Sequence, residues 1–176
     1  MIYEPTLERY EALVRRWAGR IDLVSPGDLA RFGDRHIADS LRALPAVKSL
    51  PPGPGIDVGS GVGLPGIPLA IADPSRPWRL LEPQAKRAAF LEEVVRALGL
   101  NCEVVVRRAE EIAKDQAFAA AHPVVTLRAV APPSTALRLG LPLVAPGGAA
   151  VVFVGAAAEI PPEAEVTEEG LAIVRR

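Results

Sequence analysis

Apolar residues recur at helical spacing near the beginning of the chain. Over residues 5–21 the intervals are three and four positions, which predicts an amphipathic helix whose inward stripe is Leu7, Tyr10, Val14, Trp17 and Ile21. A second helix is predicted over about residues 34–44, ended by Pro45. Together these elements predict an N-terminal helical extension over residues 1–50.

After residue 55 the pattern changes to short apolar runs that alternate with helical patterns. The runs predict strands at 55–58, 78–81, 103–106, 124–127, 149–154 and 171–174. The clearest helix is predicted over residues 84–98, with Gly99 as its C-terminal stop. Apolar strands that alternate with helices are typical of a mostly parallel sheet with helices on both faces, so residues 55–176 predict a Rossmann-like α/β core.

Composition and charge limit the possible functions. The 176 residues are 49% hydrophobic and 23% charged, which predicts one globular domain over residues 1–176. The formal net charge is −1, so any contact with nucleic acid has to be local. A single cysteine, Cys102, excludes an internal disulfide and a cysteine-rich metal site, and no metal is expected. With no secretion-signal pattern at the start, we expect a cytoplasmic protein.

The uncharged run over residues 139–158 is long enough to suggest a membrane helix. Pro142, Pro146, Gly147 and Gly148 interrupt it in the middle. We therefore expect a helix end, a turn and a buried strand here, and no contact with a membrane.

A glycine-rich segment follows the first predicted strand. Gly61, Gly63 and Gly66 fit G-x-G-x-x-G, the dinucleotide-binding pattern of oxidoreductases. The same segment fits D-x-G-x-G-x-G, which begins at Asp57 and includes Gly59 and is the S-adenosylmethionine (SAM) signature of class I methyltransferases. A carboxylate at this position repels a pyrophosphate but suits the cationic amino and sulfonium groups of SAM. The pattern favours SAM and leaves a nicotinamide-dependent oxidoreductase as the alternative.

Two further acidic positions follow the next strands. Glu82 lies about 19 residues after Gly63, where an acid that binds ribose hydroxyls is expected. Ala109 and Glu110 follow the third strand, in the loop that flanks the adenine in this fold.

Beyond these general patterns, residues 57–71 read D-V-G-S-G-V-G-L-P-G-I-P-L-A-I. This segment resembles the first motif of the bacterial 16S ribosomal RNA guanine-N7 methyltransferase G family, also called glucose-inhibited division protein B. Shorter segments resemble the family in the same order over roughly residues 17–155: R-H-I-A-D-S-L at 35–41, K-R and F-L at 86–91, R-A-E-E at 108–111, and R-A-V-A at 128–131.

The resemblance implies a class I, SAM-dependent methyltransferase that modifies N7 of a guanine in the 530 loop of 16S rRNA, within the small ribosomal subunit or a precursor. It implies cofactor contacts at Gly59, Leu64, Ala109, Glu110 and Arg128, to which the residue patterns add Asp57, Gly61, Gly63 and Glu82. Arginines and one histidine of the extension and cleft are expected to contact RNA: Arg16, Arg20, Arg35, His36 and Arg87.

Guanine N7 carries no proton at neutral pH, so no catalytic base is expected, and Arg128 is the residue expected to orient the reactants. The sequence also departs from the family pattern: Val154 replaces the usual lysine before Gly155, Asp22-Leu23-Val24 replaces N-L-T, His122-Pro123 replaces the usual acid before the fourth strand, and the tail after Gly155 is short. A SAM-binding protein that is non-catalytic or has an altered substrate therefore remains an alternative.

Overall fold

The strands of the protein form one seven-stranded sheet in the order β3-β2-β1-β4-β5-β7-β6, in a computed structural model that describes residues 4–155 and 158–176. The strands are β1 (Gly55–Val58), β2 (Trp78–Leu81), β3 (Cys102–Val105), β4 (His122–Arg128), β5 (Val144–Phe153), β6 (Glu165–Val166) and β7 (Leu171–Arg175). Strands β1 to β5 are parallel, whereas β7 runs antiparallel to β5 and β6 antiparallel to β7. The predicted mostly parallel, Rossmann-like sheet is confirmed.

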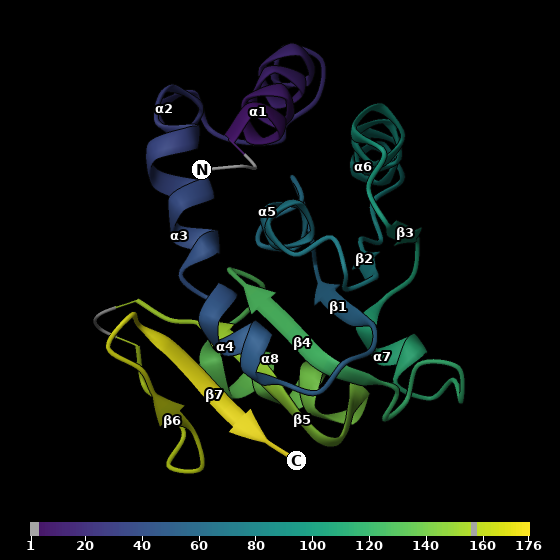
Figure 1. Ribbon diagram of the computed structural model, residues 1–176, viewed down its shortest axis with the longest axis vertical. Coiled ribbons are helices and arrows are strands. Elements are labelled where there is room, and N and C mark those ends of the chain that lie inside the picture. Colours follow the sequence, from purple (N-terminus) through teal and green to yellow (C-terminus); the bar gives the residue numbers. More distant parts are fainter. Residues whose placement is uncertain (1–3, 156–157) are drawn as a thin grey trace.

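Helices cover both faces of this sheet (Figure 1). They are α1 (Glu4–Ala18), α2 (Pro26–Ala30), α3 (Ala38–Leu41), α4 (Leu44–Ser49), α5 (Gly66–Ala72), α6 (Ala85–Leu98), α7 (Ala109–Ile112) and α8 (Pro133–Gly140), with a π-helical turn at Phe32–Ile37 and a 3-10 turn at Leu141–Leu143. One face packs Leu80 against the apolar stripes of α1, α5 and α6, and the other packs Ile56 and Leu127 against α7 and α8. Because both faces are buried, the central strands are mainly apolar on both sides, with Asp57 of β1 and Thr126 of β4 as buried polar exceptions.

Several predicted boundaries shift by a few residues. The third strand begins and ends one residue earlier than predicted, which leaves Val106 outside it and 47% exposed. β5 begins at Val144, five residues before the prediction. β6 was not predicted, because two exposed residues give no alternating pattern.

The predicted helix over residues 34–44 is wrong in its detail. The segment is divided into the π-helical turn, α3 and α4, and Pro45 lies in the first turn of α4 instead of ending a helix. A proline fits the first turn because the missing N–H would have no intrahelical partner there. The π turn adds a residue to the helical repeat and turns Arg35 and His36 toward α2, where both contact Asp28.

Arg76 joins the extension to the sheet. Its side chain is 7% exposed, and its guanidinium donates hydrogen bonds of 2.7–3.4 Å to the carbonyls of Val47, Leu50, Pro51 and Gly53. These carbonyls belong to the end of α4 and the linker into β1, where the last carbonyls of a helix lack intrahelical donors. A single buried cation thus fixes the linker between the extension and the core.

None of the helices in the two described segments has the length and apolar character needed to cross a membrane. The uncharged run contains the expected helix end and buried strand, but the turn lies at Leu141–Leu143, and Pro146, Gly147 and Gly148 lie within β5, where its register with β4 shifts. Residues 156–157 lie outside the described residues.

We predict that Arg76→Met lowers the free energy of unfolding by about 2–4 kcal/mol, because it removes a buried guanidinium that donates to carbonyls of α4 and the linker. Urea denaturation measures the change. Arg138→Met, at an exposed arginine of α8 whose side chain donates to Thr135 of the same helix, is the control and should change stability by less than about 0.5 kcal/mol. Equal stability of the two variants would contradict the role assigned to Arg76.

Candidate cofactor and substrate cleft

A cleft opens where the strand order reverses, at the carboxyl ends of β1 and β4. This is the position at which open α/β sheets bind ligands. Two cavities meet there, and Gly59 lines both. The Glu110 cavity has a volume of about 230 Å³ and is lined by Val58, Gly59, Leu81, Pro83, Arg107, Arg108, Ala109, Glu110, Val130 and Leu139. The Arg128 cavity has a volume of about 250 Å³ and is lined by His36, Gly59, Ser60, Gly61, Val62, Leu64, Arg87, Arg128 and Ala129.

Gly59 is shared by the linings of these cavities. Its φ is +71°, a left-handed conformation that side chains disfavour. A Cβ at this position would lie 2.9 Å from Cγ2 of Val130. The amides of Gly59 and Ser60 both donate to the Leu81 carbonyl at 2.9 Å, which fixes the first turn of the loop. A ligand that passes from one cavity to the other therefore meets bare backbone here.

Asp57 lies below the loop and is 0% exposed. Its carboxylate accepts a hydrogen bond from Thr126 Oγ1 at 2.8 Å and one from the Gly66 amide at 3.2 Å. The Asp57 carbonyl accepts a further bond from Ser60 Oγ at 3.0 Å. Burial raises the pKa of the carboxyl to about 6, although these bonds and the charge of Arg128 oppose the rise. The sequence predicted contact with the cofactor, but this geometry supports a role beneath the loop, where Asp57 joins β1, β4 and the start of α5.

Glu82 is also bonded to the backbone on both oxygens. Oε2 accepts from the Gly61 amide at 2.9 Å, and Oε1 accepts from the Gln84 amide at 2.8 Å. The side chain is 3% exposed. Each carboxylate oxygen keeps a second lone pair, so the predicted bond to a ribose hydroxyl stays a prediction.

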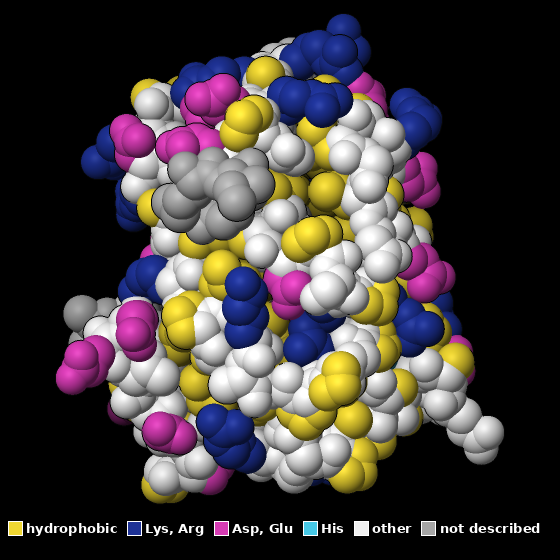
Figure 2. Space-filling view, in the orientation of Figure 1, with side chains coloured by type: hydrophobic (Ala, Val, Ile, Leu, Met, Phe, Trp, Pro, Cys, Tyr) yellow, Lys and Arg dark blue, Asp and Glu magenta, His cyan; other side chains and the backbone are white. Residues whose placement is uncertain are grey.

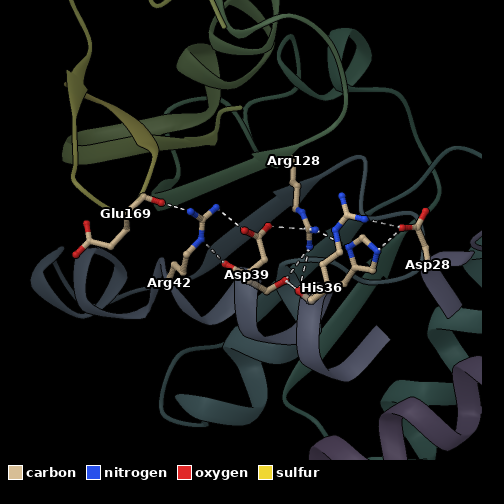
Figure 3. A network of polar contacts seen from close by, with 8 residues as sticks. Asp28, His36, Asp39, Arg42, Arg128 and Glu169 are labelled. Atoms are coloured by element: carbon tan, nitrogen blue, oxygen red, sulfur yellow. Dashed lines mark hydrogen bonds and ion pairs between the residues drawn. The ribbon is translucent and has the colours of Figure 1, made fainter. Parts of the chain in front are cut away.

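Arg128 connects the end of β4 to the extension (Figure 3). Nη1 donates to the His36 carbonyl and to Ser40 Oγ, both at 3.1 Å. Nη2 lies 2.8 Å from His36 Nδ1 and 3.1 Å from Asp39 Oδ2. Because a guanidinium only donates, Nδ1 accepts, which places the ring proton on Nε2, 3.1 Å from Asp28 Oδ1. Four Nη hydrogens therefore hold Arg128 in place.

The network continues away from the cleft. Arg42 pairs with Asp39 and donates to the Glu169 carbonyl, which belongs to the loop between β6 and β7. Side chains of the extension and β4 and the Glu169 carbonyl of the loop between β6 and β7 thus form one continuous polar network (Figure 3).

The structure brings only part of the predicted RNA set to the cleft. His36 and Arg87 line the Arg128 cavity, and Arg87 donates to the Asp22 carbonyl at 3.2 Å. Arg35 is exposed beside Asp28, whereas Arg16 pairs with Glu93 in the groove between α1 and α6. On the face in Figure 2, basic side chains lie scattered among acidic ones.

Of the predicted cofactor residues, Gly59, Gly61, Leu64, Ala109, Glu110 and Arg128 line the cavities. Sequence reasoning missed Val130 and Leu139, which close the Glu110 cavity, and Asp39, which holds Arg128. Val130 lies in the R-A-V-A segment, so the resemblance to the family could have pointed to it. Leu139 is an apolar helix residue that no sequence pattern distinguishes from a core residue. In the described part of the chain, no cluster of three or more His, Cys, Asp or Glu side chains is placed to hold a metal ion.

Comparison with known proteins gives consistent results. The protein family described as rRNA small subunit methyltransferase G matches residues 3–172. A protein of that name from Granulibacter bethesdensis is 44% identical over 153 residues, which cover 87% of this chain and 68% of the relative. The protein of the same name from Roseiflexus castenholzii is 39% identical over 168 residues, covering 95% of this chain and 70% of the relative. A crystal structure of a methyltransferase from Geobacter sulfurreducens has the same fold, with a TM-score of 0.62 and 16% identity over 96% of this chain and 86% of that one.

We predict that Asp57 makes stability depend on pH. Because the folded pKa of about 6 is above the ordinary value of 3.8, the native state binds more protons than the unfolded state between these values. The contribution of Asp57 to the free energy of unfolding therefore falls as pH rises from about 4 to about 6. Relative to Asp57→Asn, the wild type should lose on the order of 1–3 kcal/mol over this range, measured by urea denaturation at each pH.

Asp34→Asn, at an exposed carboxylate, is the control for general charge effects. If the difference in the free energy of unfolding between wild type and Asp57→Asn did not change with pH, the raised pKa of Asp57 would be contradicted.

Proposed function

Because this chain belongs to the rRNA small subunit methyltransferase G family, we propose that it methylates N7 of a guanine in the 530 loop of 16S rRNA. The membership confirms the predicted enzyme class, a methyltransferase of ribosomal RNA, and the predicted cofactor, SAM. It also decides against the nicotinamide-dependent oxidoreductase. The observation that carries the proposal is the pair of cavities that meet at Gly59, since SAM is a long ligand with two chemically different ends.

The residues of the two cavities fit the two ends of SAM. We propose that Ala109 and Glu110 bind the adenine edge and that Glu82 binds the ribose. The glycines and Leu64 then hold the amino-acid end in the Arg128 cavity. Asp57 supports this arrangement from below by fixing Gly66 and Thr126. The extension over residues 1–50 and the core over 55–176 work as one domain, because His36 and Arg128 come from opposite parts and line the same cavity.

Bound SAM supplies an electrophilic methyl group, and guanine N7 offers a free lone pair with no proton to remove. The residues of the chain therefore need only to orient the base and exclude water. Arg128 suits this role because its guanidinium is held by four bonds before any substrate arrives. His36 accepts from Arg128 on Nδ1 and faces Asp28 with Nε2, an arrangement that fits a positioning residue and assigns it no proton transfer.

The substrate in this proposal is the guanine within a small ribosomal subunit or a precursor, in the cytoplasm. The net charge is −1, and on the face in Figure 2 basic side chains lie among acidic ones, so we expect a weak phosphate contribution to RNA binding. A folded ribonucleoprotein supplies shape and neighbouring surfaces that naked RNA lacks. We expect His36 and Arg87 at the cavity to contact the RNA, with Arg16, Arg20 and Arg35 further along the extension.

The decisive experiment transfers tritiated methyl groups from SAM to small subunits that lack the modification, and then maps the labelled base. The proposal predicts one labelled guanine in the 530 loop, methylated at N7, and much weaker labelling of a short isolated RNA at physiological salt. Label on another base or on protein would contradict the substrate. SAM binding without transfer would favour a non-catalytic SAM-binding protein, the alternative that Val154 in place of the family's lysine suggests.

We predict that Gly59→Ala weakens the binding of S-adenosylhomocysteine by roughly tenfold or more, because the new Cβ strains the loop and meets Val130. Gly99→Ala is a matched control. Gly99 also has a left-handed φ, +64°, but its Cβ would meet nothing within 4 Å, and the residue lies at the end of α6. Isothermal titration calorimetry should therefore give unchanged affinity for Gly99→Ala; equal losses in both variants would contradict the assignment.

A further inference from the structure

Tyr10 links the N-terminal helix to the glycine loop. It is 0% exposed, and its hydroxyl donates to the Val62 carbonyl at 2.7 Å, across 52 residues of sequence. Its ring packs edge to face on Phe32, with the ring centroids 5.6 Å apart. Val62 lines the Arg128 cavity. A side chain of α1 thus reaches the loop that borders this cavity.

The bond from Tyr10 is one of two hydrogen bonds that hold the Val62–Gly63 peptide group. The Val62 carbonyl accepts from Tyr10, and the amide of the same peptide, that of Gly63, donates to the Ser60 carbonyl at 2.6 Å. Gly61 and Gly63, on either side of Val62, have φ values of +57° and +98°. Glycines at such angles rotate easily, so the orientation of the peptide between them depends on bonds at both of its ends.

The hydroxyl of Tyr10 contributes more than packing. Burial, followed by the charge of Asp57, raises the pKa of Tyr10 well above its ordinary value, so the hydroxyl keeps the proton that it donates to the Val62 carbonyl. The stripe of α1 needs only an apolar ring at this position to fill the core. A phenylalanine would provide that ring and leave the Val62 carbonyl buried without a donor.

We propose that Tyr10 is a positioning residue for the cofactor: its hydroxyl fixes the Val62–Gly63 peptide in the orientation that binds SAM. This inference rests on the proposed function for the identity of the ligand. If Tyr10 has this role, cofactor affinity depends on the position of α1 against the glycine loop. The helical extension then takes part in the cofactor site as well as in the proposed substrate binding.

Tyr10→Phe tests the proposal because it removes the hydroxyl and keeps the ring. We expect the Kd of S-adenosylhomocysteine, measured by isothermal titration calorimetry, to rise by roughly three- to tenfold. In the protein without ligand, amide hydrogen exchange of a peptide that covers residues 59–64 should become faster. The exchange measurement does not depend on binding or on activity.

Val14→Ala is the matched control, since Val14 is fully buried on the same helix and makes no bond to the loop. It should lower the melting temperature while the Kd stays within about twofold of the wild type and loop exchange is unchanged. An unchanged Kd in Tyr10→Phe, or an equal rise in Val14→Ala, would overturn the role of Tyr10 alone. Failure of the wild type to bind S-adenosylhomocysteine would overturn the cofactor assignment itself and this inference with it.

Discussion

The cleft depends on the two hydrogen bonds of the buried Asp57 carboxylate. The carboxylate binds Thr126 of β4 on one oxygen and the Gly66 amide at the start of α5 on the other. These bonds fix the two strands that border the cleft relative to the helix that follows the glycine loop. Burial removes water from the charged carboxylate and so destabilises it, which raises its pKa to about 6. A buried polar group of this kind favours one arrangement of the end of the loop, because moving Gly66 would take away one of the two donors to the carboxylate.

The cleft is formed jointly by the core and the extension. Arg128 at the end of β4 is held by His36, Ser40 and Asp39 of the extension, and Tyr10 of α1 bonds the glycine loop. The two contacts reach different parts of the Arg128 cavity. The position of the extension relative to the core therefore bears on both Arg128, the residue proposed to orient the substrate, and the glycine loop, which is proposed to hold the cofactor.

The sequence predicted the elements whose signal is local. The glycine loop after β1 and the stop of α6 at Gly99 follow from backbone requirements that adjacent residues reveal. Pro45 was misread, because a proline ends one helix and begins another equally well. The burial of Asp57 and the bond of Tyr10 to Val62 join positions far apart in sequence, and hydrophobic periodicity carries no information about such partners.

The most direct test of this account is a crystal structure of the protein with S-adenosylhomocysteine. We predict that the adenine lies in the cavity beside Ala109 and Glu110 and that the amino-acid end lies in the cavity beside Arg128, with the ligand crossing at Gly59. Asp57 should remain beneath the loop, bonded to Thr126 and Gly66 and out of contact with the ligand. A ligand bound elsewhere, or one whose amino group pairs directly with Asp57, would contradict the account.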